Sequence, residues 1–295
     1  MRVVFMHNPR AGGEEHCADD LAAQIVSAGH RIVGDVSRRK DLGAALKKPC
    51  DLVVLAGGDG TVGAAAEVLA GTGVPFTIIP VGTANNVATD LGFKEEVERL
   101  IDGWKDGAVR GLDRGIVRYE GKERSFLEGF GMGLFPEVMH LGVKRPMPDD
   151  PDAVLDRDLR LFREAASRHR PARYTIWADG EDLSGEYLMV EVMNFGLLGA
   201  NVQLCHADPG DGRLDLVLVG DHERGALLDH VTRLSAGKVS RLRFPVKRAD
   251  RVVISVEARR FHLDGDLHAI KRERRAHFDV RIEPHALQVL LPRAA

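Results

Sequence analysis

Short apolar runs alternate with amphipathic segments along the first third of the chain. Strands are expected at residues 2–7, 31–36, 51–56 and 76–79, and helices at 15–28, 61–69 and 84–91. The unbroken apolar run at 51–56 is typical of a strand that is buried on both faces of a parallel sheet. Strands that alternate with helices at this spacing predict a doubly wound α/β domain, which we assign to residues 1–110.

The pattern changes near Val109, after which strand-like runs dominate. Strands are expected at residues 115–119, 125–130, 173–178, 187–193, 214–219, 252–256 and 260–263, with helices at 154–166 and 224–236 and a last apolar run at 287–291. The predicted fold class is therefore an α/β parallel-sheet domain followed by a β-rich sandwich domain at residues 111–284.

Composition and charge exclude several classes of protein. The chain has 295 residues, which suits two domains, and its net charge of −3 argues against a protein that coats nucleic acid electrostatically. No apolar run approaches the roughly 18 residues that span a bilayer, and no signal peptide is visible, so we expect a soluble, cytoplasmic protein. Cys17, Cys50 and Cys205 form no CxxC pair, which leaves no support for a zinc site or a disulfide framework.

A glycine-rich loop lies directly between a predicted buried strand and a predicted helix. It consists of Gly57, Gly58, Asp59, Gly60 and Thr61. Glycines let backbone N–H groups approach an anion closely, and the helix N-terminus adds a favourable dipole. Asp59 is suited either to hold Mg²⁺ or to order the loop. The spacing matches neither a Walker loop nor the GxGxxG dinucleotide fingerprint, and a tight turn without a ligand is the alternative.

Two further loops follow predicted strands, and we expect them at the same edge of the sheet. One is Asn8-Pro9-Arg10-Ala11-Gly12-Gly13, and the other runs from Pro80 to Asn86 and contains Gly82, Thr83 and Asn85. Loops at the carboxyl ends of parallel strands line the crevice in which ligands bind. Three such loops together predict a site for a phosphorylated ligand.

The motifs NPRAGG, GGDGT and PVGTANNVATDLG resemble the catalytic domain of the diacylglycerol kinase and sphingosine kinase superfamily, especially its soluble bacterial lipid kinases. The segments DPGDGRLD at 208–215 and LDGD at 263–266 resemble later motifs of that family. The resemblance implies ATP and Mg²⁺ as cofactors and an active site in the cleft between the two domains. It also implies that residues 285–295 return to the first domain.

The resemblance also implies roles for individual residues. The residues implied to bind nucleotide are Asn8, Pro9, Arg10, Ala11, Gly12, Gly57, Gly58, Asp59, Gly60, Thr61, Gly82, Thr83 and Asn85. Asp264 is implied to be the general base that acts on a lipid hydroxyl, with Asp266 as the second carboxylate of this catalytic motif. An ordinary hairpin turn is the alternative interpretation of this segment.

Asp208 and Asp211 lie three residues apart in a loop that contains glycine and proline. Two carboxylates and a backbone carbonyl, such as that of Arg213, can converge on a hard cation. The resemblance implies a structural Mg²⁺ here, besides the one that Asp59 would hold, and a solvated acidic turn is the alternative. The histidines nearby, His206, His262 and His268, lack metal-ligand spacing and are expected to be surface or hydrogen-bonded residues.

Three positions depart from the family pattern. Gly13 stands where many relatives carry a basic residue, Asn86 where Asp is frequent, and Asp266 where Glu is usual. These departures keep a non-catalytic nucleotide- or lipid-binding regulator open as an alternative. NAD kinase is a second alternative, because its superfamily shares the GGDGT motif.

The expected partner is a lipid substrate, met transiently at the inner face of the membrane by a peripheral protein. Because the net charge is close to neutral, that visit would depend on a local patch or a hydrophobic mouth. The run from Phe130 to Phe135 is expected either to line an acyl-chain entrance or to pack in the core. A monomer and a homodimer are both compatible with the sequence.

Overall fold

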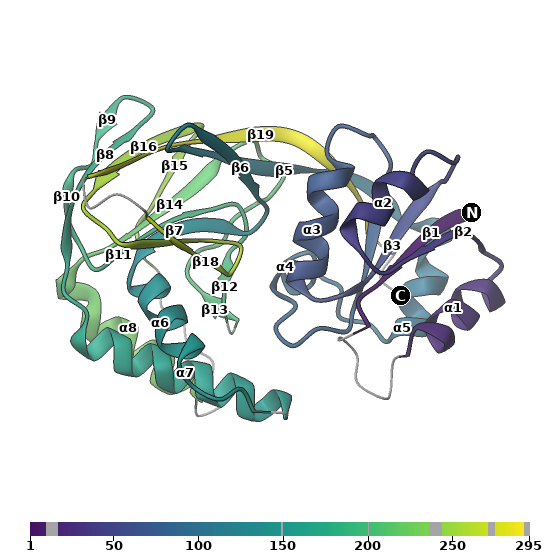
Figure 1. Ribbon diagram of the computed structural model, residues 1–295, viewed down its shortest axis with the longest axis horizontal. Helices are drawn as coiled ribbons and strands as arrows, with labels where there is room; N and C mark the ends of the chain where they lie inside the picture. Colours follow the sequence, from purple (N-terminus) through teal and green to yellow (C-terminus); the bar gives the residue numbers. More distant parts are fainter. Residues whose placement is uncertain (10–16, 149, 200, 236–243, 271–274, 292–295) are drawn as a thin grey trace. The chain divides into compact units, whose positions relative to one another are not determined.

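The computed structural model describes residues 1–9, 17–148, 150–199, 201–235, 244–270 and 275–291. The chain folds into two compact units (Figure 1). One consists of Met1–Arg114 with Pro284–Ala295, and the other of Gly115–Glu283. Each unit has its own hydrophobic core.

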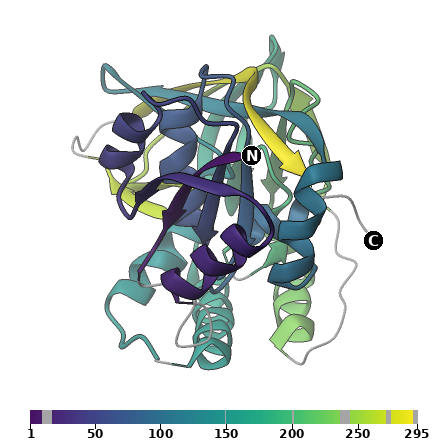
Figure 2. The same ribbon diagram turned by 90° about the vertical axis from the view of Figure 1, so that its right-hand side faces the viewer.

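The first unit contains a parallel sheet with the strand order β2-β1-β3-β4-β19. Its strands are β1 (Arg2–His7), β2 (Arg31–Val36), β3 (Leu52–Gly57), β4 (Phe76–Pro80) and the end of β19 (Ala276–Leu291). Its helices are α1 (Ala18–Ser27), α2 (Arg39–Ala45), α3 (Asp59–Leu69), α4 (Asn86–Asp90) and α5 (Val97–Asp102), followed by a short 3₁₀ turn, η1 (Gly103–Asp106). Helices cover both faces of this sheet, as Figures 1 and 2 show.

The two faces of β1 explain its continuous apolar run. Val3 and Phe5 pack with Leu21 and Ile25 of α1 on one face of the sheet, whereas Val4 is equally buried on the other face. A strand buried on both faces needs no polar alternation. The doubly wound arrangement of the first domain is therefore confirmed.

The second unit is built mainly from two antiparallel sheets. One sheet contains the order β10-β8-β16-β19, with β5 and β9 at its sides and β6 paired to β5, and the other has the order β15-β14-β11-β7-β17-β18. The strands are β5 (Ala108–Tyr119), β6 (Lys122–Phe126), β7 (Gly129–Gly133), β8 (Ala172–Ala178), β9 (Glu181–Asp182), β10 (Gly185–Tyr187), β11 (Met189–Met193), β12 (Leu197–Leu198), β13 (Val202–Gln203), β14 (Leu214–Val219), β15 (Val246–Ala249), β16 (Arg251–Val256), β17 (Arg260–Leu263) and β18 (Asp266–Ala269).

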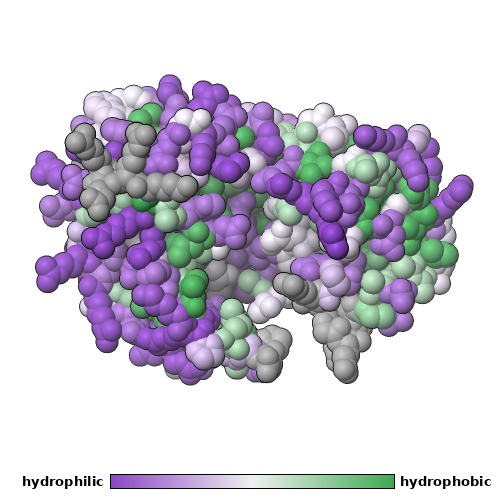
Figure 3. All heavy atoms as spheres, in the orientation of Figure 1, coloured by the Kyte–Doolittle hydropathy of each residue, from purple (hydrophilic) through white to green (hydrophobic). Residues whose placement is uncertain are grey.

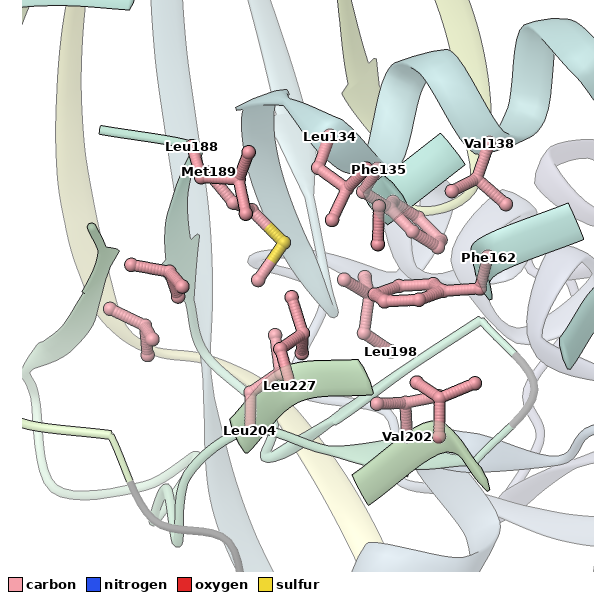
Figure 4. Packing of buried hydrophobic residues seen from close by; sticks show 14 of the residues in the cluster. Leu134, Phe135, Val138, Phe162, Leu188, Met189, Leu198, Val202, Leu204 and Leu227 are labelled. Atoms are coloured by element: carbon pink, nitrogen blue, oxygen red, sulfur yellow. The ribbon is translucent and has the colours of Figure 1, made fainter. Parts of the chain in front are cut away.

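Two cores lie on the two faces of the sheet that contains β7 and β11. Alternate residues of these strands, such as Phe130 and Val190, pack between the two sheets. Met189 and Met193 face the opposite way and pack in a second core with residues of α6 (Leu134–Val143), α7 (Pro151–Arg168) and α8 (Arg224–Ser235). Figure 4 shows Met189 in this core, beside Leu134 and Leu188. A short 3₁₀ turn, η2 (Asp221–Glu223), precedes α8. The β-sandwich expected for the second domain is confirmed, with a layer of helices against one sheet.

Several elements differ from the sequence-based expectation. α2, α5 and α6 were not expected, and the strand expected at 125–130 is divided between β6 and β7. β19 has 16 residues and begins well before the expected run at 287–291. Among the described residues, no helix combines the length and apolarity that are needed to span a membrane.

Candidate functional site

The loops that follow β3 and β4 approach each other backbone to backbone. A Cβ atom built on Gly82 would lie 2.3 Å from the Cα of Gly58, and one on Gly57 would lie 2.3 Å from Oγ1 of Thr61. No side chain larger than hydrogen fits at Gly57 or Gly82 without movement of its neighbours. Gly60 is exposed on the first turn of α3, and a Cβ there would meet nothing within 4 Å. The glycines therefore hold the loops together and leave space at the start of α3.

Asn85 fixes the conformation of the second loop. Its Oδ1 accepts a hydrogen bond from the backbone N–H of Gly82 (3.0 Å), and its Nδ2 donates to the carbonyl of Gly82 (2.8 Å). Asn85 adopts a left-handed conformation (φ 54°), which asparagine tolerates better than most residues do. Thr83 is exposed on the same loop. The loop is thus closed by its own asparagine before α4 begins.

Asp59 connects the two loops. Its Oδ1 accepts a hydrogen bond from the backbone N–H of Val87 in the first turn of α4 (3.0 Å). Burial raises the pKa of the Asp59 carboxyl, and hydrogen bonds from the backbone N–H groups of Val87 and Asn86 oppose this rise. Of the two roles that the sequence left open for Asp59, the structure shows the ordering of the loops.

The loop after β1 lies beside the same edge of the sheet. The backbone N–H of Asn8 donates to the carbonyl of Ala56 on β3 (3.0 Å), and Pro9 is exposed. Arg10, Ala11, Gly12 and Gly13 lie outside the described residues. The structure therefore brings together the described nucleotide-binding candidates of the first unit, at the carboxyl edge of its parallel sheet.

Asp264 occupies a cradle of consecutive backbone N–H groups in the second unit. Its carboxylate accepts hydrogen bonds from the backbone N–H groups of Leu127 (2.6 Å), Glu128 (2.7 Å) and Gly129 (3.0 Å). Its own N–H donates to the carbonyl of Gly129, and its φ of 47° places it in the left-handed region. The carboxylate is thereby held rigidly at the end of β17.

Two effects act in opposite directions on the Asp264 carboxyl. Burial raises its pKa, while the three backbone N–H groups and the charge of His262 lower it. Burial has the larger effect, and the resulting pKa is about 6. A carboxyl that titrates near pH 6 is ionised at neutral pH and still accepts a proton readily. This balance is suited to general-base chemistry.

Asp266 lies on the wall of a cavity in the second unit. The cavity has a volume of about 570 Å³, and Gly265, Asp266 and Leu267 contribute one side. The other walls are mainly apolar and come from Phe135, Val138, Met139, Gly142, Val143, Met147, Leu159, Leu161, Phe162, Gly199 and Val202, with Arg157 and Asp158 as further polar residues. Figure 4 shows the rings of Phe135 and Phe162 in this region, near Val138.

Phe135 belongs to the cavity wall, but most of the run from Phe130 to Phe135 does not. Phe130 and Met132 pack in the core between the two sheets. Phe135 lies on α6, which begins at Leu134. The two interpretations of this run therefore apply to different residues within it.

Asp208 and Asp211 make hydrogen bonds within their own loop. Oδ1 of Asp208 accepts from the N–H of Gly210 (3.1 Å), and Oδ1 of Asp211 accepts from the N–H of Arg213 (2.9 Å). The described residues include no group of three or more His, Cys, Asp or Glu side chains arranged to hold a metal ion. The Mg²⁺ site at Asp208, Asp211 and Arg213 stays a prediction.

Asp215 was missed by the sequence analysis as a member of this acidic region. It is buried, and its Oδ1 lies 3.4 Å from Nε of Arg248. Burial raises its pKa to about 6; Arg248 opposes the rise, and the carboxylates of Asp211 and Asp208 add to it. Asp215 is the one polar residue in the otherwise apolar strand Leu214–Val219. This isolated carboxylate was the feature of the sequence that could have revealed a buried acidic residue here.

The three histidines have three different environments. His206 interacts with Gln203 and is exposed, and His268 stacks on Phe261. His262 is fully buried and lies 2.7 Å from Oε2 of Glu191. The sequence could not reveal this pair, because its members are 71 residues apart.

Two family models match the chain. A diacylglycerol kinase catalytic domain matches residues 2–117, and a YegS C-terminal NAD kinase beta sandwich-like domain matches residues 160–291. The matches follow the order of the α/β unit and the sandwich unit.

Relatives match nearly the whole chain. A diacylglycerol kinase of Mycobacterium tuberculosis is 29% identical over 307 residues, which is 99% of this chain and 96% of the relative, and one of Bacillus subtilis is 26% identical over 283 residues (90% and 89%). The crystal structure of a diacylglycerol kinase from Bacillus anthracis strain Sterne shares the fold, with a TM-score of 0.72 at 19% identity over 98% of this chain and 96% of that one. The chain therefore belongs to the diacylglycerol kinase superfamily, a family of lipid kinases.

Proposed function

We propose that this protein transfers the γ-phosphoryl group of ATP, with Mg²⁺, to a hydroxyl group of a diacylglycerol-like or sphingoid-like lipid. The observation that carries the proposal is a carboxylate turn, Asp264-Gly265-Asp266, beside a cavity with mainly apolar walls. A hydroxyl group attached to a long apolar chain is the kind of acceptor that suits both features.

The donor nucleotide would bind to the first unit. The N-terminus of α3, open at Gly60, and the loop closed by Asn85 offer backbone N–H groups to phosphate oxygens. Asp59 holds the two loops in register through Val87. The packing of Gly58 against Gly82 supports this assignment, because the fold excludes side chains at the point where phosphates would approach.

The lipid would bind to the second unit. Asp264 would accept the proton of the lipid hydroxyl, while the backbone N–H groups of Leu127, Glu128 and Gly129 keep its carboxylate in place. Asp266 would contact the polar head of the acceptor from the cavity wall, and Phe135 and Phe162 would contact the chain. The cavity volume of about 570 Å³ lies within the range of small-molecule sites.

Mg²⁺ would neutralise charge on the phosphates when it is bound. Asp59 would be the ligand on the side of the donor nucleotide, because hard cations prefer carboxylate oxygens and Asp59 lies between the two glycine loops. Asp208 and Asp211 would hold a second ion in the other unit. All three carboxylates already accept backbone hydrogen bonds, so a bound ion would share or replace these contacts.

Membrane contact would occur at the mouth of the cavity. Val143 and Met147 line the cavity and are 77% and 65% exposed, and Lys144 and Arg145 are exposed between them. On the face shown in Figure 3, hydrophilic residues predominate and hydrophobic ones form small groups. We propose that this small apolar and basic mouth touches the inner face of the membrane transiently, as a peripheral protein would.

A direct test measures transfer from radiolabelled ATP to a panel of acceptors in mixed micelles. The panel contains a diacylglycerol, sphingosine, NAD and free glycerol. We expect phosphate on one of the two lipids and none on NAD or glycerol. Phosphorylation of NAD alone would support the NAD kinase alternative, and ATP binding without any transfer would support the regulator.

Two variants sharpen this test. Asp264→Asn should abolish transfer, and Asp229→Asn on the exposed face of α8 serves as a matched control that should keep it. A Val143→Asp/Met147→Asp variant should lose activity on micelles but keep activity on a short-chain, water-soluble diacylglycerol. Equal losses on both substrates would contradict a membrane role for the mouth.

A further inference from the structure

A buried pair of titratable side chains lies next to the proposed base, and the mechanism above does not use it. Nε2 of His262 on β17 lies 2.7 Å from Oε2 of Glu191 on β11, and both side chains have no exposed surface. Within the part of the chain that the structure describes, Nδ1 of His262 and Oε1 of Glu191 have no hydrogen-bond partner. Each member of the pair therefore depends on the other.

The two side chains can meet because the residue between them, on the intervening strand, is a glycine. β7 runs between β11 and β17, and Gly131 is the residue of β7 that pairs with both Glu191 and His262. A Cβ on Gly131 would lie 1.8 Å from Oε2 of Glu191. The carboxylate thus occupies the space of the missing side chain and reaches across a whole strand to the imidazole.

Stability alone does not explain this arrangement. A buried pair with unsatisfied atoms is generally no more stabilising than apolar side chains of the same volume. The surrounding residues of this face, such as Met189 and Met193, are apolar and would accommodate such a replacement. The cost of a desolvated pair therefore points to a functional role.

The pair has connections to both parts of the proposed acceptor site. His262 lies two residues before Asp264, and its charge lowers the pKa of the Asp264 carboxyl. The ring of Phe135, which lines the cavity, meets the His262 ring edge-on with 4.8 Å between the centroids. The imidazole is accordingly the member that acts on the base, and Glu191 acts through it.

We propose that Glu191 and His262 are positioning residues that share one proton and shift it toward His262 while Asp264 is ionised. The inference rests on the proposed function, in which Asp264 is the base. When the O–H bond of the lipid breaks and a proton binds to Asp264, the proton on Nε2 of His262 returns to Oε2 of Glu191. His262 is therefore positively charged while Asp264 is negatively charged, and His262 becomes neutral when Asp264 is protonated. Water is excluded from the pair, so the two changes are coupled.

The groups around the pair set the direction in which the pKa values of Glu191 and Asp264 change. Burial raises the pKa of Glu191, so that its carboxyl competes with the imidazole for the shared proton. Other charged or titratable groups on the elements around the pair include Glu128, Glu137, His140, Tyr174, Asp215, Arg260, Asp264, Asp266 and His268. Glu191→Gln removes the acid that supplies the proton, so Asp264 loses its cationic neighbour and its pKa must rise.

The test compares pH profiles of kcat/KM for the wild type, Glu191→Gln, His262→Gln and the double variant. We expect the acidic limb to move up by about one pH unit in all three variants. For a pKa that moves from about 6 to about 7, kcat/KM at pH 6 falls by about fivefold, and the loss disappears at alkaline pH. The double variant should resemble the single variants, because the pair acts as one unit. Met193→Leu, on the same face of β11, is the control that should leave the limb in place.

An activity-independent measurement covers the case in which Glu191→Gln does not fold. The ring nitrogen resonances of His262, assigned by their loss in His262→Gln, should shift when Asp264→Asn is introduced into the otherwise unchanged protein. An equal loss of activity at every pH, or His262 resonances that do not respond to Asp264, would overturn the inference. Absence of lipid phosphorylation in the wild type would instead overturn the proposed function, and the spectra would still decide the coupling.

Discussion

At the residue scale, the carboxylate of Asp264 has the most constrained environment of the candidate site. Three successive N–H groups, from Leu127 to Gly129, point at it, and Asn194 holds the same segment by donating to the carbonyl of Leu127 (2.9 Å). Such a cradle favours the charged form, whereas burial favours the neutral form. The motif LDGD in the sequence identified the residue, but the cradle is formed by a segment 135 to 137 residues away, so no local pattern could predict it.

The first residue-scale prediction concerns pH. Because burial raises the pKa of Asp264 to about 6 and only the ionised form accepts a proton, kcat/KM should fall as the pH drops through about 6. A steady-state profile with a lipid acceptor in mixed micelles measures this limb. A limb near the ordinary pKa of an aspartate, about 4, would show that the working base has a different environment.

The second residue-scale prediction concerns Asp264→Asn. The carboxamide keeps only one oxygen for the N–H groups of the cradle, and we expect a loss of about 1–3 kcal/mol in the free energy of unfolding. Transfer should fall at least 1,000-fold, roughly the contribution of a general base and its positioning. Denaturant unfolding and single-turnover assays measure the two effects. ATP affinity, which belongs to the first unit, should be unchanged; if it also falls, the loss of activity cannot be assigned to the base.

At the element scale, the ends of β3 and β4 show why the glycine loops were predictable. Their positions after apolar strands and before helices are fixed by local sequence, and the structure places them together. The cross-loop contact between Gly58 and Gly82 was not predictable, because it depends on how the two strands lie side by side. α6 was missed for a related reason: it begins after Gly133 (φ 90°) in an apolar run that contains Pro136, and this composition does not separate a helix from a strand.

One element-scale prediction follows from the close approach of these loops. Gly82→Ala places a methyl group against the backbone of Gly58, so the loops that follow β3 and β4 must separate. We expect kcat/KM for ATP to fall by roughly 10- to 100-fold, which is typical when positioning groups move by about 1 Å. Gly225→Ala, in α8 and with open space around it, is the control and should keep full activity.

A further prediction at this scale separates the two roles of Asp59. Asp59→Asn keeps an acceptor for the N–H of Val87, whereas Asp59→Ala removes it and should lower the free energy of unfolding by about 1 kcal/mol. If Asp59 only orders the loops, the Asn variant should retain most of its activity. If it also binds Mg²⁺, both variants should need a higher Mg²⁺ concentration for half-maximal transfer.

At the scale of the whole molecule, each unit carries one of the two tryptophan residues. Trp104 is buried in the first unit, and Trp177 lies in the second unit and is 45% exposed. Variants with a single tryptophan, Trp177→Phe and Trp104→Phe, therefore report on one unit each. The division of the chain that these variants follow was visible in the sequence as the change of pattern near Val109.

The prediction that belongs to this scale concerns Val289. This residue is fully buried in β19 and pairs with Phe76 of β4. Val289→Asp buries an unpaired charge, and we expect the fluorescence transition of Trp104 to move to lower denaturant concentration by the equivalent of about 3 kcal/mol or more. Trp177 should report a smaller change. The same shift at both tryptophans would mean that the units unfold as one.

The pairing of β19 with β4 also has a consequence for the order in which the protein is made. The sheet of the first unit contains β1, from residues 2–7, and also the end of β19, which pairs with β4 and comes from residues near 289. On the ribosome, this sheet cannot be completed until residues 276–291 have emerged, although its other strands emerge early. Arrested nascent chains that expose residues only up to 270 lack β19, which supplies Phe278 and Val280 to the sandwich core as well as Val289 to the first sheet, so neither unit should resist protease in them.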